Sequence, residues 1–206
     1  MVAPAAFAKG MPAVYTTPGR PQHGGVRLGV RPRTWLVLCL VWQSTGAASQ
    51  PSTDVPASNR ADLNDPPPRP PADDAAQKAK LLFDAIVSDA PERAESVFFP
   101  RAAFLRVKDM RDPGRYYDRL KRRFEQDIHA LHAALPDPAN ARFERFELAK
   151  RGGFVRVREE ANLLPYWASR HSFIHYRVGD QALRLEVRVM ITWDDRWYVI
   201  HLNEFH

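Results

Sequence analysis

The sequence has very little cysteine: Cys39 is the single thiol among 206 residues. A single cysteine excludes a disulfide within the chain. The sequence also lacks a glycine-rich phosphate-binding loop, a nucleophile elbow and a dinucleotide-binding fingerprint, and the Gly152-Gly153 pair is better explained by a tight hairpin. These absences remove the motif-based case for a nucleotide-dependent enzyme or a serine hydrolase.

Long hydrophobic runs are lacking too. The apolar run at residues 35–42 has eight residues, whereas a membrane-spanning helix needs about 20. Arg31 and Arg33 precede this run and the small residues 46–48 follow it, an order typical of a secretory signal peptide. We therefore expect residues 1–48 to be a leader removed on export to the periplasm or the cell exterior, with an uncleaved membrane anchor as the alternative.

Residues 1–26 are rich in alanine, proline and glycine and show no apolar periodicity. They would make an unusually long positive region for a signal peptide. We interpret them as a mis-assigned start, with translation beginning near Leu28 or Val30. Because Cys39 belongs to the leader, thiol nucleophiles and redox chemistry are excluded from the exported chain.

Acidic residues are absent from the leader, which biases the charge of the whole chain. The formal net charge is +6, but removing the leader's five basic residues leaves 25 basic against 24 acidic residues, or about +1. Nucleic-acid binding rests on a clustered basic surface, so it loses its compositional support. The basic run at residues 121–123 is interpreted as the solvated face of a helix.

Residues 49–74 are dominated by proline, aspartate and small polar residues. Such a segment buries too little apolar surface to offset the entropy of ordering, so we predict a disordered linker that is extended around residues 66–71. A proline-recognition ligand is the alternative for this stretch. Residues 75–206 are then expected to form one domain.

Apolar spacing predicts helices in the first half of this domain. Asp73 or Asp74 can cap a helix with an apolar stripe through residues 79–87, and a second short helix is expected at residues 92–97. Residues 98–107 are apolar and broken by a proline, with room for one brief strand. A long helix is expected from the cap Asp112, with one buried face: Tyr117, Leu120, Phe124, Ile128, Leu131 and Leu135.

The apolar period changes to two after residue 141, which predicts an antiparallel sheet. The alternation is clearest at residues 182–193, where apolar and polar positions follow one another. The expected strands are 142–150, 154–161, 169–178, 182–193 and 197–202.

This order of elements, ending in "EVRVMITWDDRWYVIHL", resembles the NTF2-like (SnoaL-like) superfamily over residues 75–205. The resemblance implies an α+β fold of the NTF2-like or cystatin-like roll type, with helices packed on a curved antiparallel sheet and a pocket between them. Members of the superfamily include isomerases, dehydratases and cyclases as well as non-catalytic binding modules, so the fold does not choose the function. The catalytic Asp–His pairs of its enzymes have no counterpart motif here.

Candidate ligand-binding residues lie in the third expected strand. Alternation puts His171, Phe173, His175 and Arg177 on one side, and a pocket facing that side would suit an anionic or carbonyl-bearing ligand. If the same side faces solvent, these are ordinary surface residues.

Two aromatic residues, Tyr166 and Trp167, are expected in the loop before this strand. They either line the mouth of a pocket or cover the edge of the sheet. Of the adjacent carboxylates Glu159 and Glu160, at most one can join a site, because neighbours in a strand face opposite ways.

No metal site or cofactor is expected. His129 and His132 are three residues apart on one helix, but no other His or Cys pair offers companion ligands. Asp194 and Asp195 are assigned to a hairpin turn, where their backbone angles are favoured.

The sequence therefore predicts an exported, non-catalytic binding module for a small molecule or an envelope protein. The alternative is a pocket enzyme in which His171 or His175 carries a proton and Arg177 holds an anion; an interaction module for cell-wall machinery is a third hypothesis. A homodimer through the outer sheet face is one expected assembly, indicated only by Met190 and Thr192.

Overall fold

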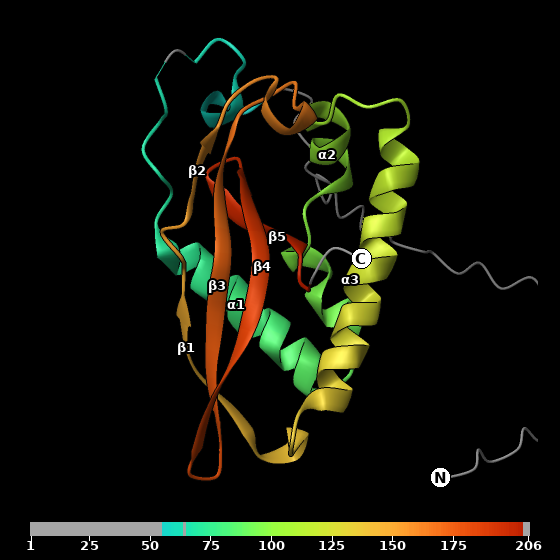
Figure 1. Ribbon diagram of the computed structural model, residues 1–206, viewed down its shortest axis with the longest axis vertical. Coiled ribbons are helices and arrows are strands. Elements are labelled where there is room, and N and C mark those ends of the chain that lie inside the picture. Colours follow the sequence, from blue (N-terminus) through green and yellow to red (C-terminus); the bar gives the residue numbers. More distant parts are fainter. Residues whose placement is uncertain (1–54, 64, 204–206) are drawn as a thin grey trace, which may run out of the picture. The chain divides into compact units, whose positions relative to one another are not determined.

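Residues 55–63 and 65–203 are described by the computed structural model (Figure 1). The predicted leader at residues 1–48, including Cys39, lies outside the described residues. All described residues belong to one compact unit. Its α-helices and strands are α1 (Ala72–Val87), α2 (Arg101–Val107), α3 (Pro113–Ala134), β1 (Ala141–Glu147), β2 (Gly152–Val155), β3 (Tyr166–Val178), β4 (Gln181–Trp193) and β5 (Arg196–His201).

The predicted cap and buried face of the long helix α3 are confirmed. The side chain of Asp112 accepts a hydrogen bond from the Arg115 backbone N–H at 3.0 Å, and Pro113 occupies the first turn. The start of α1 differs: the helix begins at Ala72, so Asp73 and Asp74 lie in its first turn, where their negative charge favours the helix.

A five-stranded antiparallel sheet carries the second half of the domain. Its order is β1-β3-β4-β5, and β2 also pairs with β3, next to β1 along the same edge. Strand β5 pairs with residues 189–193 of β4. In Figure 1, α1 crosses one side of the sheet and α3 stands beside it. The fold is therefore α+β, with helices packed on a curved antiparallel sheet, as the sequence predicts.

The predicted ends of some strands were wrong. Strand β2 stops at Val155, and residues 159–161 form a short 3-10 turn in place of a strand. Strand β3 begins at Tyr166, so the two aromatics expected in a loop are its first residues. Residues 98–107 form only an isolated bridge, between Phe98 and Val199, and then α2, because the chain turns into a helix after Pro100.

One hydrophobic core joins the helices to the sheet. The ring of Phe83 on α1 lies 5.3 Å from that of Tyr176 on β3, and the ring of Phe98 lies 4.9 Å from that of Phe124 on α3. Ile174 on β3 is fully buried in the same cluster. No helix among the described residues has the length and apolar character needed to cross a membrane.

The described part of the predicted linker is packed on the domain, which corrects the expectation of a disordered tether for residues 55–71. We call residues 55–63 and 65–71 the strap. The Asn59 side chain is 1% exposed; its Nδ2 donates to the Pro165 carbonyl at 2.8 Å and its Oδ1 accepts from the Asp194 N–H at 3.0 Å. Asn59 thus links the strap to the start of β3 and to the last hairpin.

Two tryptophans hold the proline-rich part of the strap. Trp167 Nε1 donates to the Pro67 carbonyl at 3.0 Å, and Trp197 Nε1 donates to the Pro70 carbonyl at 3.3 Å. The Arg69 guanidinium lies 5.2 Å from the centre of the Trp197 ring. Proline carbonyls are free acceptors and the proline φ is fixed in advance, so this segment loses little entropy on docking.

The residues that indicated a dimer face are not exposed. Met190 and Thr192 are 1% and 3% exposed within the chain itself. Thr192 Oγ1 accepts a hydrogen bond from the Trp167 N–H at 3.0 Å. Neither side chain is therefore available to a second copy of the chain.

Candidate functional site

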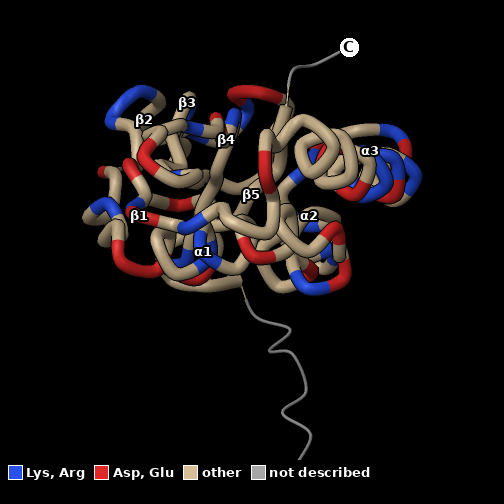
Figure 2. The backbone as a smooth tube through the Cα atoms, turned by 90° about the horizontal axis from the view of Figure 1, so that it is seen from below, with Lys and Arg blue, Asp and Glu red and all other residues tan. Residues whose placement is uncertain are grey.

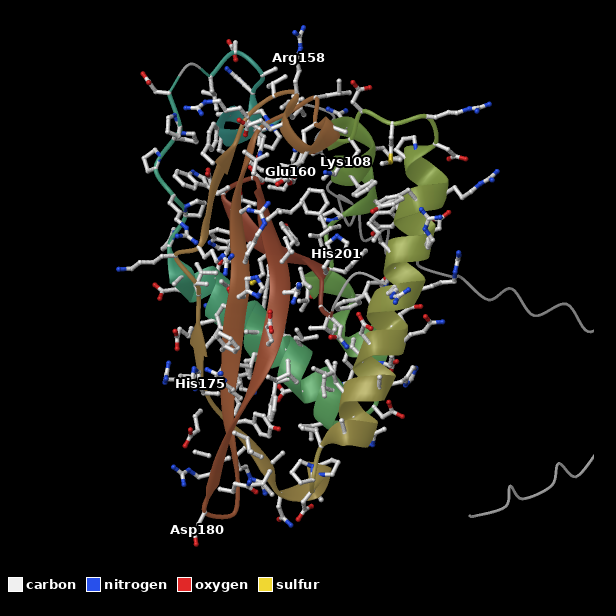
Figure 3. All side chains as sticks on the ribbon, in the orientation of Figure 1. Lys108, Arg158, Glu160, His175, Asp180 and His201 are labelled. Carbon is white, nitrogen blue, oxygen red and sulfur yellow. The ribbon has the colours of Figure 1, made fainter. Side chains whose placement is uncertain are left out.

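A cavity of about 320 Å³ lies between the helices α2 and α3 and the strands β3–β5. Its apolar walls come from α2, α3, β4 and β5: Phe104, Tyr116, Leu120, Val189, Ile191 and Ile200. Lys108, Glu160 and His201 lie on the side of the sheet that faces α2 and α3 (Figure 3). A volume at the low end of known ligand sites, with apolar walls and a few polar groups, is the usual form of a small-molecule site.

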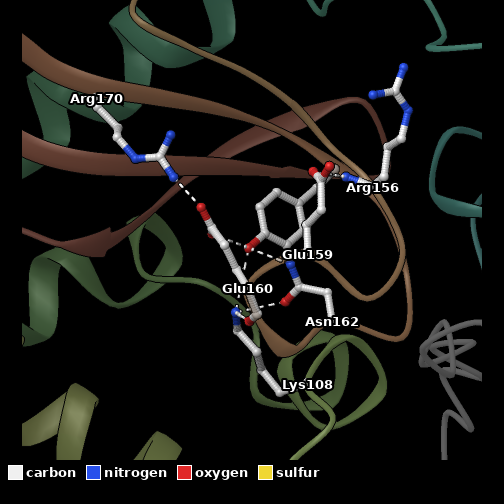
Figure 4. A network of polar contacts seen from close by, with 7 residues as sticks. Lys108, Arg156, Glu159, Glu160, Asn162 and Arg170 are labelled. Atoms are coloured by element: carbon white, nitrogen blue, oxygen red, sulfur yellow. Dashed lines mark hydrogen bonds and ion pairs between the residues drawn. The ribbon is translucent and has the colours of Figure 1, made fainter.

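Lys108, at the end of α2, organises the polar end of the cavity (Figure 4). Its Nζ donates to Asn162 Oδ1 at 2.7 Å, to the Glu160 carbonyl at 3.3 Å and to the Tyr166 hydroxyl at 3.4 Å. Three acceptors match the three donors of an ammonium group. Lys108 is therefore fully used in holding the surrounding loop in place.

The Tyr166 hydroxyl is the centre of the same network. It donates to Glu160 Oε2 at 3.1 Å and accepts from Asn162 Nδ2 at 2.9 Å. The other carboxylate oxygen of Glu160 pairs with the Arg170 guanidinium. Because the hydroxyl, the amide, the carboxylate and the ammonium satisfy one another, the network gives the cavity a rigid polar end.

The loop that carries Glu160 and Asn162 has an unusual backbone. Arg158, Glu160 and Ala161 have φ values of 71°, 50° and 53°, in the left-handed region that non-glycine residues rarely adopt. The Asp109 N–H donates to the Ala161 carbonyl at 2.8 Å, which ties the loop to the end of α2. Local strain of this kind collects at functional sites.

Burial shifts the pKa values of two members of the network. Burial, with the nearby Glu160 charge, raises the pKa of Tyr166 above its usual value, so the phenol keeps its proton. Burial lowers the pKa of Lys108, and the Glu160 carboxylate partly opposes that change. Both effects follow from placing polar groups against the apolar walls of the cavity.

His201, at the end of β5, is the second polar feature of the cavity. Burial, with a smaller contribution from the Lys108 charge, lowers the pKa of His201 to about 4. The imidazole is therefore neutral at pH 7. A neutral imidazole can donate one hydrogen bond and accept another.

The low pKa of His201 makes stability depend on pH. Between pH 7 and pH 5 the unfolded chain gains a proton at this histidine, whose ordinary pKa is about 6.5, while the folded chain does not. The free energy of unfolding should thus fall as pH drops, by about 2 kcal/mol more than in a His201→Gln variant. Urea unfolding at both pH values measures this difference, and equal losses in the two proteins would contradict the assignment.

A second cavity, of about 340 Å³, continues the first along α3. The two share Tyr116, Leu120, Ile200 and His201 in their linings. The two cavities are therefore neighbours, and we call the pair the α3 groove.

The structure brings two of the predicted site residues to the α3 groove. Tyr166 and His171 both line the first cavity. Nδ1 of His171 lies 2.6 Å from Glu186 Oε1. His171 has a φ of 63°, which interrupts the alternation of β3, and its neighbour Arg170 lines the same cavity.

The other predicted site residues line neither cavity of the groove. The imidazole of His175 lies 3.0 Å from the Glu147 carboxylate, and exposed Arg177 pairs with Glu144 at 2.8 Å. The Trp167 indole packs on Phe154 and the strap. These three residues therefore hold strands and strap together.

The two histidines of α3, His129 and His132, contact different partners. His129 Nδ1 lies 2.6 Å from the Asp89 carboxylate, and His132 Nδ1 lies 2.9 Å from the Ile86 carbonyl. Within residues 55–63 and 65–203, no group of three or more His, Cys, Asp or Glu side chains is placed to hold a metal ion.

Several residues of the groove carry no signal in the sequence. Lys108 and His201 each follow the last apolar residues of an element, and Asn162 lies in a segment of irregular structure. Glu160 was one of two carboxylates of which at most one was expected to join a site; Glu159 instead accepts from the Arg156 N–H at 2.8 Å. The packing of α2 against this loop brings Lys108, Glu160 and Asn162 together, and β5 adds His201 to the lining of the same cavity.

Comparison with known proteins adds no family or relative: no protein-family model matches the chain, and no curated protein or solved structure gives a significant match.

Proposed function

We propose that the chain is an exported, non-catalytic module that binds a small molecule in the α3 groove, on an NTF2-like roll. The observation that carries this proposal is the cavity of about 320 Å³ with apolar walls and a hydrogen-bonded polar end. The NTF2-like assignment rests on the order of elements and on a pocket between helices and a curved sheet. Export rests on the signal-peptide pattern of residues 1–48.

The network at the polar end favours binding over catalysis. Lys108, Tyr166, Asn162 and Glu160 are hydrogen-bonded to one another, which uses their donors and acceptors to fix the shape of the site. A group that moves a proton needs a pKa close to the working pH. Burial raises the pKa of Tyr166 further from neutrality, which suits a structural role.

Ligand-induced thermal shifts test the proposal. A compound from a metabolite panel, at about a hundredfold excess over its Kd, should raise the unfolding midpoint by about 5 °C or more. Val189→Trp, which fills the first cavity from β4, should abolish that shift. Leu81→Trp, at a position on α1 that is 45% exposed, is the matched control and should retain it. Absence of any shift across the panel would contradict small-molecule binding and favour a protein partner.

A pocket enzyme is the second candidate, and His201 is the observation that favours it. Its imidazole lines the cavity and is neutral at pH 7, so it has a free-base form that can take a proton from a bound substrate, but its pKa of about 4 makes it a weaker base than an ordinary histidine. Mass spectrometry of each bound compound after incubation with the chain separates the two candidates. Recovery of unchanged compound supports binding alone, and a changed mass that disappears in His201→Gln supports catalysis.

A further inference from the structure

One end of the domain exposes apolar side chains. Among residues 55–63 and 65–203, three large apolar side chains are at least 37% exposed, and two of them, Leu105 and Leu163, belong to this end. Leu105 lies on α2, and the Leu163 N–H donates to the carbonyl of Val107, the last residue of α2, at 2.7 Å. In Figure 1 the start of α3 lies at the same end. Exposed apolar side chains with polar neighbours mark interaction sites.

The two leucines are carried by one connected support. The Asp109 N–H donates to the Ala161 carbonyl at 2.8 Å, and Lys108 pairs with Asn162 in an isolated antiparallel bridge. The Lys108 side chain adds its hydrogen bond to Asn162 Oδ1 at 2.7 Å. These contacts join the end of α2 to the loop that carries Leu163. A surface that is ordered in advance loses little entropy when it binds.

Positive charge is concentrated in the same part of the chain. Residues 101–123, which hold α2 and the first half of α3, contain nine basic and three acidic residues. The rest of the chain from residue 49 contains 16 basic and 21 acidic residues. Over the domain as a whole the two signs are mixed (Figure 2). A basic segment on an otherwise acidic domain orients that domain toward an anionic surface.

Several arginines near the leucines are available to such a surface. Within the part of the chain that the structure describes, the guanidinium groups of Arg106, Arg111 and Arg158 contact no carboxylate. Arg111 and Arg158 are exposed, and Arg158 points away from the domain (Figure 3). The following carboxylates at this end already hold contacts within the domain: Asp112, Glu159 and Glu160. A guanidinium without a carboxylate partner keeps its donors for an external phosphate.

We propose that this end of the domain docks on the surface of an anionic lipid bilayer. We call it the docking end and define it by Leu105, Arg106, Arg111, Arg158 and Leu163. The leucines enter the boundary between head groups and acyl chains, while the arginines bind lipid phosphates around them. A soluble polyanion would match the charges but would leave both leucines in water. The proposal goes beyond the proposed function, because it needs no ligand in the α3 groove.

Co-sedimentation with lipid vesicles tests the proposal. The chain that starts at Ser49 is suitable, because it holds the whole compact unit and lacks the basic and apolar residues of the leader. Vesicles with about 30 mol% phosphatidylglycerol in phosphatidylcholine should bind it at least about tenfold more tightly than vesicles of phosphatidylcholine alone. Raising NaCl from about 0.1 M to about 0.5 M should weaken this binding, because salt screens the charges.

Single substitutions locate the contact. Arg111→Gln and Arg158→Gln should each weaken binding to the anionic vesicles about fivefold. Leu163→Gln should weaken it roughly tenfold, because a leucine side chain no longer leaves water. The matched controls are Arg177→Gln, beside the β3–β4 hairpin at the opposite end of the domain (Figure 3), and Leu81→Gln on α1. Both controls should leave binding unchanged.

A fluorophore shows which residues enter the lipid. The chain that starts at Ser49 has no cysteine, so one introduced thiol can be labelled selectively. A polarity-sensitive fluorophore on Leu163→Cys should shift its emission to shorter wavelength when anionic vesicles are added. The same fluorophore on Leu81→Cys should not shift. Equal shifts at the two positions would contradict the assigned orientation.

The remaining outcomes separate this proposal from the proposed function. Equal binding to both kinds of vesicle, or unchanged affinity in Arg111→Gln and Arg158→Gln, would overturn the docking end. Binding to heparin without binding to vesicles would assign the arginines to a soluble polyanion and would overturn it as well. None of these results bears on the α3 groove, which the thermal-shift panel tests in the absence of lipid.

Discussion

A chain that starts at Ala72 should unfold at a midpoint roughly 10 °C or more below that of a chain that starts at Ser49. The shorter chain lacks the strap, so the fully buried Trp197 ring becomes exposed on that side and loses its hydrogen bond to Pro70. The hydrogen bonds of Asn59 to Pro165 and Asp194 are lost as well. Loss of that burial and of these bonds amounts to several kcal/mol. Differential scanning calorimetry of both chains measures the difference.

Two single substitutions act as controls for the deletion. Asn59→Ala should reproduce about 2 kcal/mol of the loss, because it leaves the Pro165 carbonyl and the Asp194 N–H without their partner. Asp62→Ala, at an exposed position of the same strap, should change the free energy of unfolding by less than about 0.5 kcal/mol. Midpoints that agree within about 2 °C for the two chain lengths would restore the tether interpretation of residues 49–71.

Replacing Asn162 by alanine should lower the free energy of unfolding by about 2–3 kcal/mol. The side chain is 1% exposed, accepts from Lys108 at 2.7 Å and donates to Tyr166 at 2.9 Å. Its removal takes the shortest of the three hydrogen bonds from the half-buried Lys108 ammonium, and it leaves the buried Tyr166 hydroxyl with one donor fewer. Urea unfolding measures the change.

Asn140→Ala is the matched control for this position. Asn140 is exposed and its amide donates to Asp137 at 2.8 Å, so its loss should cost less than about 1 kcal/mol. The loss of unfolding free energy in Asn162→Asp should lie between the losses in Asn162→Ala and Asn140→Ala. A carboxylate at position 162 still accepts from Lys108 but cannot donate to Tyr166. A loss in Asn162→Ala no larger than in Asn140→Ala would show that the network does not hold the loop.

Regular elements were predictable because their signals are local. The apolar stripe of α3, its cap at Asp112 and the strand β4 each have their signal within one stretch of chain, and the structure has all three. The alternation of β4 holds as far as Val187 and is lost at the register shift between Val189 and Met190, after which residues 190–192 are all buried. The strap was missed because its composition is that of a disordered segment, while its partners, Trp167 and Trp197, lie 100 and 127 positions away from the prolines that they hold. Composition describes a segment in isolation and not the surface that it meets.

The candidate site was only partly predictable for a similar reason. Tyr166 and His171 were identified as candidates, and both line the groove, but alternation alone placed His175 and Arg177 on the same side as His171. The positive φ of His171 changes that geometry, and no short-range pattern in the sequence announces it. Lys108 enters the site through the packing of α2, which depends on the whole fold.

The strap also sets the order in which the molecule can be completed. Asn59 and Asp194 are separated by 135 positions, so their contact forms only after nearly all of the domain has left the ribosome. Contacts of such long sequence separation slow folding, because a large loop must close before they contribute. During synthesis the strap is therefore made first but can dock only after the hairpin of β4 and β5 has been made. Docking of the strap is thus a late step in folding, and it joins the two ends of the domain.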